Sequence, residues 1–476
     1  MNNNKTHILI IGAGLCGSLL ALRLGQLGFS VTLAEKRPDL RKVKISAGRS
    51  INLAFSDRGI KAMKMAGINE EVMELCIPMK GRMLHQKNGE TKLSPYSGRP
   101  HEFINSISRS GLNKLLLDKA EKLKNVNLFF NKKCTGVDFE NTKATFYHYK
   151  NKTTETIKAD AIFGTDGAGS VLRKSYFLEK KFLFSLSQQF LNYGYKELSI
   201  LSKNNDYQIF KNALHIWPRG SFMLIALPNL DGSFTVTLFL SYKEGKYNFE
   251  NLNTSDAVKR FFTTEFPDAL AVMPNLTDDF FNNPTSPLGT VKCSPWHYKG
   301  NTLLMGDAAH AVVPFYGQGM NASFEDIVVL DRILEYFLKQ NAKIDWEHIF
   351  GQYEKERKKD TDAIADLAID NFFEMRDHTT NSLFLEKRKI EMALEHTFPN
   401  DYASKYSMVT FKEDMGYRKA MILGRAQDKA LLNLIADKDI KTDGVLDAKQ
   451  LKLILKKIQT TTAEILDEDQ VLVSKI

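Results

Sequence analysis

Three glycines near the N-terminus have the spacing of a turn that binds phosphate. Gly12, Gly14 and Gly17 follow a short apolar run and precede leucines at helical spacing. In such a strand–turn–helix unit the first glycine permits the turn, the second lets the backbone approach a pyrophosphate, and the third lets helix and strand pack closely. Glu35 ends a second predicted strand and can accept hydrogen bonds from a ribose 2′-OH, which disfavours a 2′-phosphate. The sequence therefore predicts a dinucleotide site whose tightly held nucleotide is not NADP.

Two acids that follow other apolar runs mark further turns. Asp307 lies in Leu-Leu-Met-Gly-Asp-Ala-Ala-His, residues 303–310, and Asp166 lies in Gly-Thr-Asp-Gly-Ala-Gly-Ser, residues 164–170. Taken alone, each could be an ordinary strand-to-helix turn. The glycines after Asp166 could open a second nucleotide fold, but Leu172 occupies the third glycine position and no βαβ unit with a terminal acid follows. We therefore expect one dinucleotide domain and no dedicated second domain for a pyridine nucleotide.

The three motifs, in this order and at this spacing, resemble those of the FAD-dependent aromatic hydroxylases, which are single-component flavin monooxygenases. The resemblance implies tightly bound, non-covalent FAD whose ribityl chain contacts Asp307, and NADPH as a transient co-substrate that reduces the flavin. It places the turn at Asp166 near the pyrophosphate, a region also associated with NADPH in the family. The further FAD-binding positions that the resemblance implies are Leu15, Ala54, Arg109, Met320 and Asn321.

A second set of segments narrows the resemblance. The set comprises residues 48–54, 215–219, 226–229 and 314–321, and Asn371 with residues 374–376. These segments are similar to those of the branch that hydroxylates kynurenine, and the likeness runs from about residue 5 to residue 420. The implied reaction converts L-kynurenine to 3-hydroxy-L-kynurenine with NADPH and O2, in tryptophan catabolism and in NAD biosynthesis through quinolinate.

Two other functions are weighed against this one. The first is another flavin enzyme, either a hydroxylase for a different aromatic acid or a flavin halogenase. Halogenases of this fold use a catalytic lysine in a Trp-rich motif, and no such motif is found among the three tryptophans. The second is a flavoprotein that binds a protein partner through a helical C-terminus and turns over only incidentally.

The resemblance also implies a substrate site. Arg82 and Tyr96 match the pair that binds the amino-acid carboxylate, for which an arginine fork and a phenol hydroxyl are suited. Asn371 and Tyr406 match two positions that serve the polar end of the ligand. Without the resemblance, Arg82 would be interpreted as a surface charge. Tyr96 would be interpreted as a loop residue, and Tyr406 as an ordinary packing residue. The remaining substrate positions are Leu214, Met223, Ile225, Phe239, Phe315, Tyr316 and Met375, of which strand alternation alone would assign the first four to a core.

The loop of residues 314–319 is the segment that we expect nearest to the chemistry. Pro314, Gly317 and Gln318 lead into a predicted helix whose N-terminal N–H groups can stabilise negative charge on the flavin. The aniline nitrogen of the implied substrate activates its own ring, so no strong protein base is predicted. Excluding water is the main requirement, which favours a dry pocket with aromatic walls. His310 is expected to pack beside the cofactor rather than to act as a base.

The elements that must hold these residues are predicted from periodicity. Residues 7–35 predict a βαβ unit, residues 185–290 predict antiparallel hairpins, and the chain after residue 345 is helical and charged. The fold class is α/β: a Rossmann-like FAD-binding domain of the aromatic hydroxylase type, an antiparallel β-sheet substrate domain and a helical C-terminal region. The expected domains are residues 1–77 with 102–184 and 290–345, residues 78–101 with 185–289, and residues 346–476.

Composition sets the remaining limits. A chain of 476 residues with 43% hydrophobic and 25% charged residues is an ordinary globular protein, and a net charge of +9 suits anionic ligands. The basic residues are scattered, which argues against a nucleic-acid partner, and the densest cluster, residues 355–359, is predicted to be a solvated helix face. Four separated cysteines without metal spacing predict no disulfide, no metal site and a cytoplasmic location. No apolar run is long enough for a membrane span. The sequence leaves open the oligomeric state, the choice between NADPH and NADH, and the role of residues 421–476.

Overall fold

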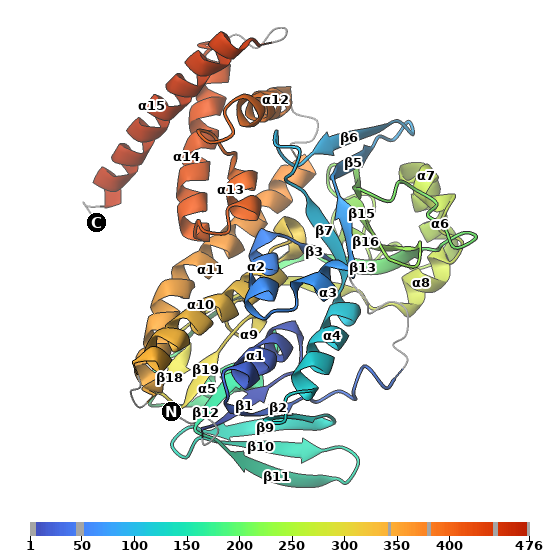
Figure 1. Ribbon diagram of the computed structural model, residues 1–476. Coiled ribbons are helices and arrows are strands. Elements are labelled where there is room, and N and C mark those ends of the chain that lie inside the picture. Colours follow the sequence, from blue (N-terminus) through green and yellow to red (C-terminus); the bar gives the residue numbers. More distant parts are fainter. Residues whose placement is uncertain (1–5, 44–51, 341–343, 378–381, 441–445, 474–476) are drawn as a thin grey trace. The chain divides into compact units, whose positions relative to one another are not determined.

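The computed structural model describes residues 6–43, 52–340, 344–377, 382–440 and 446–473 (Figure 1). The chain divides into two compact units, each assembled from three separate segments. Unit 1 comprises Met1–Cys76, Ser106–Tyr193 and Ser286–Ala365, and unit 2 comprises Ile77–Asn105, Gly194–Thr285 and Asp366–Ile476. The three-domain division expected from the sequence stays a prediction, because these units group the C-terminal helices with the segments of the β domain.

Unit 1 is built on a six-stranded sheet with the order β18-β19-β12-β1-β2-β8. Its strands are β1 (His7–Ile11), β2 (Ser30–Ala34), β8 (Val126–Phe129), β12 (Ala161–Gly164), β18 (His297–Tyr298) and β19 (Thr302–Leu304). All pairings are parallel except that of β18, which closes one edge as an antiparallel strand. The carboxyl ends of β1, β2, β12 and β19 therefore lie at one edge, where ligands of open α/β sheets bind.

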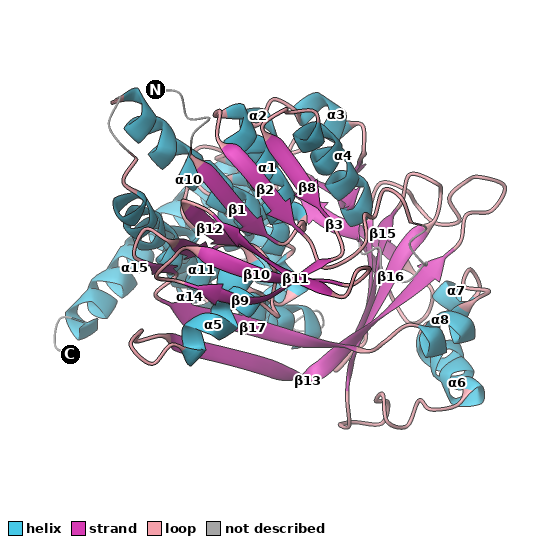
Figure 2. Cartoon of the chain, turned by 90° about the horizontal axis from the view of Figure 1, so that it is seen from below, coloured by secondary structure: helices cyan, strands magenta, loops and turns pink. Residues whose placement is uncertain are grey.

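Both faces of this sheet are covered, which explains why most residues of its central strands are apolar. Ile8 and Ile10 pack into a core with α1 (Leu15–Gln26) and α4 (Arg109–Glu121) (Figure 2). Leu9 and Ile11 point to the other face. There they meet the three-stranded sheet of β9 (Lys132–Asp138), β10 (Lys143–His148) and β11 (Thr153–Lys158).

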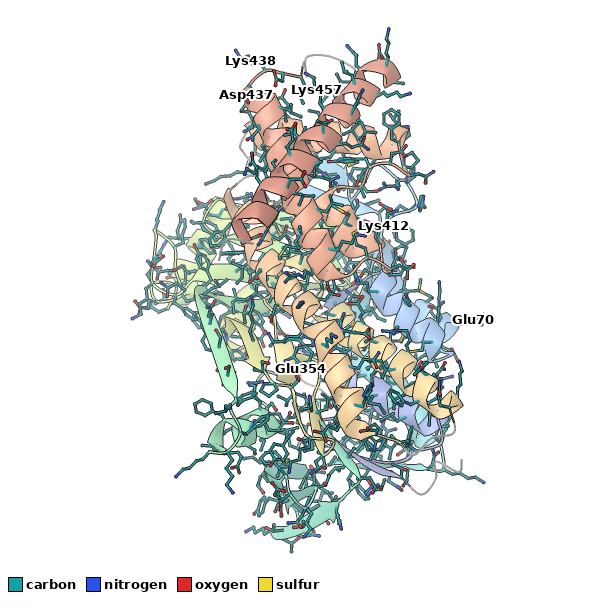
Figure 3. All side chains as sticks on the ribbon, turned by 90° about the vertical axis from the view of Figure 1, so that its left-hand side faces the viewer. Glu70, Glu354, Lys412, Asp437, Lys438 and Lys457 are labelled. Atoms are coloured by element: carbon teal, nitrogen blue, oxygen red, sulfur yellow. The ribbon has the colours of Figure 1, made fainter. Side chains whose placement is uncertain are left out.

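The remaining elements of unit 1 surround the carboxyl edge of the sheet. They are β3 (Asn52–Phe55), α2 (Asp57–Met65), α3 (Asn69–Met73), β7 (Ile104–Ser108), α5 (Val171–Leu178), β17 (Ser286–Ser294), α9 (Asp307–His310), η2 (Pro314–Tyr316) and α10 (Gly319–Lys339). The long helix α11 (Trp346–Asp377) begins in unit 1 and ends in unit 2. Its Glu354 accepts hydrogen bonds from the Trp296 N–H at 2.8 Å and the Ser294 hydroxyl at 3.1 Å, and so holds the start of β18 (Figure 3).

Most strands of unit 2 belong to a seven-stranded sheet with the order β17-β13-β16-β15-β14-β5-β6. They are β13 (Ser185–Ile200), which begins in unit 1, and β16 (Phe234–Ser241), β15 (Met223–Pro228), β14 (Leu214–Pro218), β5 (Gly81–His85) and β6 (Thr91–Pro95). The predicted hairpins of β14, β15 and β16 are antiparallel, whereas β5 joins β14 in parallel. One face packs on α6 (Ser255–Glu265), α7 (Pro267–Leu270) and α8 (Leu276–Asn282). Trp217, Leu224 and Leu238 fill that interface.

The C-terminal part of unit 2 is helical, as the sequence predicts. Its helices are α12 (Ser382–Thr397), α13 (Lys405–Phe411), α14 (Tyr417–Ala436) and α15 (Ala448–Val473). The remaining strand, β4 (Cys76–Met79), belongs to a three-stranded sheet with the order β3-β7-β4. Leu431, Ile454 and Ile458 belong to one apolar cluster of α12, α14 and α15. At one end of this cluster the Lys457 ammonium donates to the Asp439 carbonyl at 2.8 Å, next to Asp437 and Lys438 (Figure 3).

The α/β class with an antiparallel sheet and a helical C-terminal region is thus confirmed. Within the part of the chain that the structure describes, none of the helices combines the length and the apolar character that crossing a membrane requires. The same residues contain no cluster of three or more side chains that could ligate a metal ion.

Candidate active site

In the glycine turn after β1, two glycines pack against the protein and the third faces open space. Gly12 has a φ of +103°, and a Cβ there would lie 2.7 Å from the Thr165 carbonyl oxygen. A Cβ on Gly17 would lie 2.0 Å from the Gly12 carbonyl oxygen, so both positions require glycine for packing within the protein. Gly14 differs, because no atom lies within 4 Å of the position of its absent Cβ. Its backbone therefore faces open space, which a bound phosphate can approach.

Glu35 lies beside this turn, directly after β2. One carboxylate oxygen accepts the Ala13 N–H at 2.9 Å, and the other accepts the Arg37 Nε–H at 2.8 Å. The second oxygen also accepts the Arg37 N–H at 3.0 Å, so the oxygen that accepts from Ala13 is the one with a lone pair left for a ribose hydroxyl. The predicted ribose contact stays a prediction, and the structure adds that Glu35 fixes the glycine turn. Leu15, at the start of α1, is buried behind it.

Asp307 is presented by a strained glycine. Gly306 has a φ of +58° and precedes α9, so the half-buried Asp307 lies in the first turn of that helix. Its carboxylate accepts no hydrogen bond from the residues that the structure describes, which leaves it available to a ligand hydroxyl. The Gly306 N–H donates to the Asp326 carboxylate of α10 at 3.0 Å.

Asp326 is the centre of a buried polar network that the sequence did not reveal. The oxygen that accepts from Gly306 also contacts the His310 Nε2 at 2.6 Å, and the second oxygen accepts the Arg357 Nε–H at 2.8 Å. Burial alone would raise the pKa of Asp326, but His310 and Arg357 outweigh it and the pKa is lowered. Asp326 therefore stays ionised and holds the turn that presents Asp307.

Arg357 corrects one prediction. The basic run of residues 355–359 was expected to be a solvated helix face, and this is wrong for Arg357, which is 2% exposed. Its guanidinium also pairs with Glu325 at 2.7 Å, and the other oxygen of Glu325 pairs with the buried Arg58 at 2.5 Å. The sequence signal was the acidic pair at positions 325 and 326, within the buried part of a helix, which required buried cations.

The loop of residues 314–319 is fastened by Asn321. The Asn321 amide donates to the carbonyls of Ala54 at 2.9 Å and Gly317 at 3.0 Å, and it accepts the Ser56 N–H at 3.1 Å. Gly317 has a φ of +66°, and a Cβ there would lie 2.9 Å from the Ala54 Cβ. The predicted residues Ala54, Gly317 and Asn321 therefore meet, and α10 begins at Gly319 from a fixed loop.

The other residues predicted around this loop take different environments. Phe315, Tyr316 and Gln318 are buried, Met320 is half-buried and Pro314 is exposed. His310 is buried against Trp296, with ring centroids 5.4 Å apart, as expected for a packing residue. Arg109 is the exposed first residue of α4. Of the predicted segment 48–54, residues 48–51 lie outside the described residues.

Asp166 has one bonded and one unbonded oxygen. The first accepts the Val171 N–H at 2.6 Å at the start of α5, while the second is buried and has no partner among the described residues. Burial raises the pKa of this carboxyl. Arg173 of α5 donates to the Ala308 carbonyl at 2.7 Å and thereby connects this turn to α9. Gly14 facing open space, the available carboxylate of Asp307, the unpartnered oxygen of Asp166 and the fixed loop of unit 1 fit a flavin dinucleotide.

In unit 2 the strand register gathers the predicted substrate residues on one face. Leu214 lies opposite Arg82, and Met223 lies opposite Phe239. Ile225 lies opposite Ile216, which shares its face with Leu214 because alternate residues of a strand point the same way. Arg82, Leu214, Met223, Ile225 and Phe239 therefore share the face opposite to α6, α7 and α8.

Arg82 lies against two tyrosines. Its guanidinium carbon is 5.1 Å from the ring centroid of Tyr96 and 4.4 Å from that of Tyr406, and the two rings are 5.8 Å apart and almost parallel. Tyr96 is fully buried, and its hydroxyl has no hydrogen-bond partner among the described residues. Burial raises the pKa of Tyr96 well above its usual range, so the phenol keeps its proton. A cation beside an unpaired hydroxyl donor is suited to a carboxylate.

Asn371 and Met375 lie on α11 in the same unit. Asn371 is buried, and its amide contacts the Met375 sulfur at 3.4 Å. A thioether is a weak acceptor, so this contact is a weak one. Their predicted roles stay predictions.

Comparison with known proteins identifies the class first. Residues 5–368 match the family described as FAD binding domain. The fold is also that of 2-methyl-3-hydroxypyridine-5-carboxylic acid oxygenase, at 19% identity and a TM-score of 0.62 over 82% of this chain and 98% of that chain. Pseudomonas putida p-nitrophenol 4-monooxygenase matches at 15% identity and a TM-score of 0.63 over 90% and 99% of the two chains. The class is therefore that of FAD-binding flavoproteins, and FAD is the cofactor.

Relatives of known name narrow this class. The kynurenine 3-monooxygenase of Dictyostelium discoideum is 44% identical over 94% of this chain and 98% of its own length. That of Myxococcus xanthus is 42% identical over 95% and 97%. The chain belongs to the FAD-binding domain family of flavin monooxygenases, within its kynurenine 3-monooxygenase group.

Proposed function

We propose that this chain hydroxylates L-kynurenine to 3-hydroxy-L-kynurenine, with FAD as resident cofactor and NADPH and O2 as co-substrates. The observation that carries the proposal is the arrangement of Arg82 against Tyr96, whose buried hydroxyl has no protein partner. An unpaired buried hydroxyl costs roughly 1–3 kcal/mol, a cost that a bound carboxylate removes. Relatives named kynurenine 3-monooxygenase match almost the whole length of this chain, which supports the proposal.

The protein residues bind, orient and exclude water. Arg82 and Tyr96 hold the substrate carboxylate, and the sheet face of Leu214, Met223 and Phe239 supplies an apolar wall for the ring. When bound, FAD supplies the redox chemistry, which is hydride uptake from NADPH and activation of O2. The N-terminal N–H groups of α10 would favour negative charge on a bound flavin. The aniline group of the substrate activates its own ring carbon, so no protein base is assigned.

Location is part of the same proposal. Cys16, Cys76, Cys134 and Cys293 are free thiols. Burial raises the pKa of Cys134 to about 12, which keeps that thiol protonated and unreactive. Thiols of this kind need no oxidising environment, and we place the enzyme in the cytoplasm.

Product analysis tests the proposed reaction. The purified protein is incubated with L-kynurenine, NADPH and air, and the products are separated by HPLC. We expect 3-hydroxykynurenine in proportion to the NADPH consumed. Other aromatic carboxylic acids, offered in parallel, test the alternative of a hydroxylase with a different substrate. Turnover of one of these acids in preference to kynurenine would overturn the proposal.

The same assay examines Arg82. Replacing Arg82 with alanine removes a charged contact, and we expect the KM for kynurenine to rise on the order of 30- to 1,000-fold, equivalent to about 2–4 kcal/mol. FAD content should be unchanged, because Arg82 belongs to unit 2 and the FAD residues to unit 1. An unchanged KM would mean that other groups hold the carboxylate.

A further inference from the structure

Six charged side chains of the C-terminal helices form a continuous chain of alternating sign, which we call the charge chain. In order, its members are Glu374, Lys405, Asp428, Lys387, Glu391 and Arg388. The successive N–O distances are 2.5, 2.8, 2.7, 3.1 and 3.6 Å. The charge chain thus connects α11, α13, α14 and α12 within unit 2 (Figure 1).

Both ends of the charge chain reach the tyrosines that flank Arg82. Lys405 directly precedes Tyr406 in α13. At the other end, the Arg388 guanidinium donates to the Tyr96 carbonyl at 2.6 Å and to the Pro95 carbonyl at 3.2 Å. The two aromatic residues against the guanidinium of Arg82 are therefore held by one set of ion pairs.

Glu395 of α12 is a second attachment for the two segments that contain Tyr96 and Tyr406. One oxygen of Glu395 accepts the Gly98 N–H at 2.9 Å, and the other accepts the Ser404 N–H at 2.9 Å. Gly98 packs so closely on α12 that a Cβ there would lie 2.2 Å from the Met392 carbonyl oxygen. The residues just after Tyr96 and just before Tyr406 are thus attached to one helix.

Burial makes a break in the charge chain costly. The side chains of Lys387, Glu391, Lys405 and Asp428 are between 4% and 14% exposed. Burial alone would lower the pKa of Lys387, but Glu391 and Asp428 outweigh it and the pKa is raised. A buried ion that loses its partner is costly, so neutralising one member forces its neighbours to move.

An ion pair of the same helices provides a contrast. Arg425 of α14 pairs with Asp370 of α11 at 2.8 Å, but these side chains are 46% and 37% exposed. Such a surface pair contributes little, because water solvates either partner equally well when the pair is broken. It therefore serves as a matched control for the buried charge chain.

We propose that Asp428, Lys387 and Lys405 are positioning residues, which set the carboxylate site of Arg82, Tyr96 and Tyr406 through the charge chain. This inference rests on the proposed function, because it takes that site to bind the substrate carboxylate. It assigns a role to α14, which carries none of the site residues that the resemblance implies. The C-terminal helices act on substrate affinity from behind the tyrosines rather than by touching the ligand.

The test compares two ligands that differ only in the carboxylate. L-Kynurenine and kynuramine, its decarboxylated form, are titrated into the oxidised holoenzyme without NADPH, and binding is followed in the flavin absorption spectrum. The variants are Asp428→Asn and Arg388→Gln, and the controls are Asp370→Asn and Arg425→Gln. Since a misplacement of about 1 Å at a binding group costs roughly a hundredfold, we expect the preference for kynurenine to fall about tenfold to a hundredfold in the first pair. The controls should keep the preference within about twofold.

The outcomes separate the two proposals. If the unaltered protein does not prefer kynurenine over kynuramine, the proposed carboxylate site is wrong. If it does, but Asp428→Asn and Arg388→Gln keep the same preference as their controls, the positioning role is wrong and the proposed function stands. Thermal unfolding and FAD content are measured for each variant. Should Asp428→Asn not fold, Arg388→Gln decides, because its half-buried side chain lies at the end of the charge chain.

Discussion

At the scale of single residues, Asp326 shows how a side chain that touches no ligand can decide whether one binds. It accepts from Gly306, His310 and Arg357, and an asparagine would direct an amide N–H at one of these donors. We expect Asp326→Asn to weaken FAD binding roughly tenfold to a hundredfold, equivalent to about 1.4–3 kcal/mol. Fluorescence titration of the apoprotein with FAD measures this. Glu356→Gln, in the surface pair with Arg332, is the control, and equal FAD affinity in both variants would contradict the role of Asp326.

Tyr96 gives a prediction in which stability and binding move in opposite directions. Its buried hydroxyl has no partner among the described residues, so Tyr96→Phe should raise the free energy of unfolding of the ligand-free protein by roughly 1 kcal/mol. The same change removes a donor to the carboxylate, and the KM for kynurenine should rise about five- to tenfold.

Tyr176→Phe is the control for this change. The Tyr176 hydroxyl is also buried but bonds to Thr302 at 2.6 Å, so its loss should lower stability and leave the KM unaltered. Denaturant unfolding and steady-state kinetics distinguish the two variants. A stability loss in Tyr96→Phe would show that its hydroxyl is already satisfied in the free protein.

At the scale of elements, features encoded within a few residues were predicted better than pairings between segments far apart in the chain. The glycine turn and the strand ends at Gly164 and Leu304 carry their chemistry within a few residues, and the turns lie where the sequence predicts them. The parallel pairing of β5 with β14 joins segments far apart in the chain, so the position of Arg82 opposite Leu214 came from the resemblance rather than from periodicity. Arg357 was misjudged because a run of charges does not show which helix face meets another helix.

The loop of residues 314–319 yields a prediction at this scale. Gly317→Ala strains the left-handed backbone and also brings a Cβ to 2.9 Å from Ala54. The strain alone costs roughly 1–2 kcal/mol. We expect the displaced loop to admit water, so that more of the NADPH consumed appears as hydrogen peroxide and less as hydroxylated product.

Gly220 is a matched control for Gly317. It has the same φ of +66°, but no atom lies within 4 Å of its absent Cβ, so Gly220→Ala suffers the backbone strain without the clash. Peroxide formed per NADPH oxidised is the measurement. Equal peroxide yields in the two variants would show that the contact between the loop and β3 does not protect the reaction.

At the scale of the whole molecule, we expect one dinucleotide domain, without a second one for NADPH, and a reactive reduced flavin that must be protected. We expect NADPH oxidation to wait for substrate, with the carboxylate on Arg82 and Tyr96 as the signal. Helix α11 carries Arg357 of the Asp326 network in its unit 1 part and Glu374 of the charge chain in its unit 2 part. Kynurenine should therefore accelerate anaerobic flavin reduction in stopped-flow experiments.

A carboxylate analogue with a ring that cannot be hydroxylated completes this test. It should accelerate reduction as kynurenine does, but in air it should release hydrogen peroxide. Equal reduction rates with and without ligand would contradict the expectation that substrate binding controls flavin reduction. They would not contradict the assignment as a hydroxylase.

The three-segment build of unit 1 has a consequence for biosynthesis. β1 pairs with β12, and β12 with β19, so the sheet that begins at residue 7 is completed only by residues 302–304. A nascent polypeptide leaving the ribosome therefore carries the glycine turn long before Asp307 and Asn321 are translated. We expect FAD to be captured late in synthesis or after release, and the half-built sheet to expose apolar strand faces to chaperones until then.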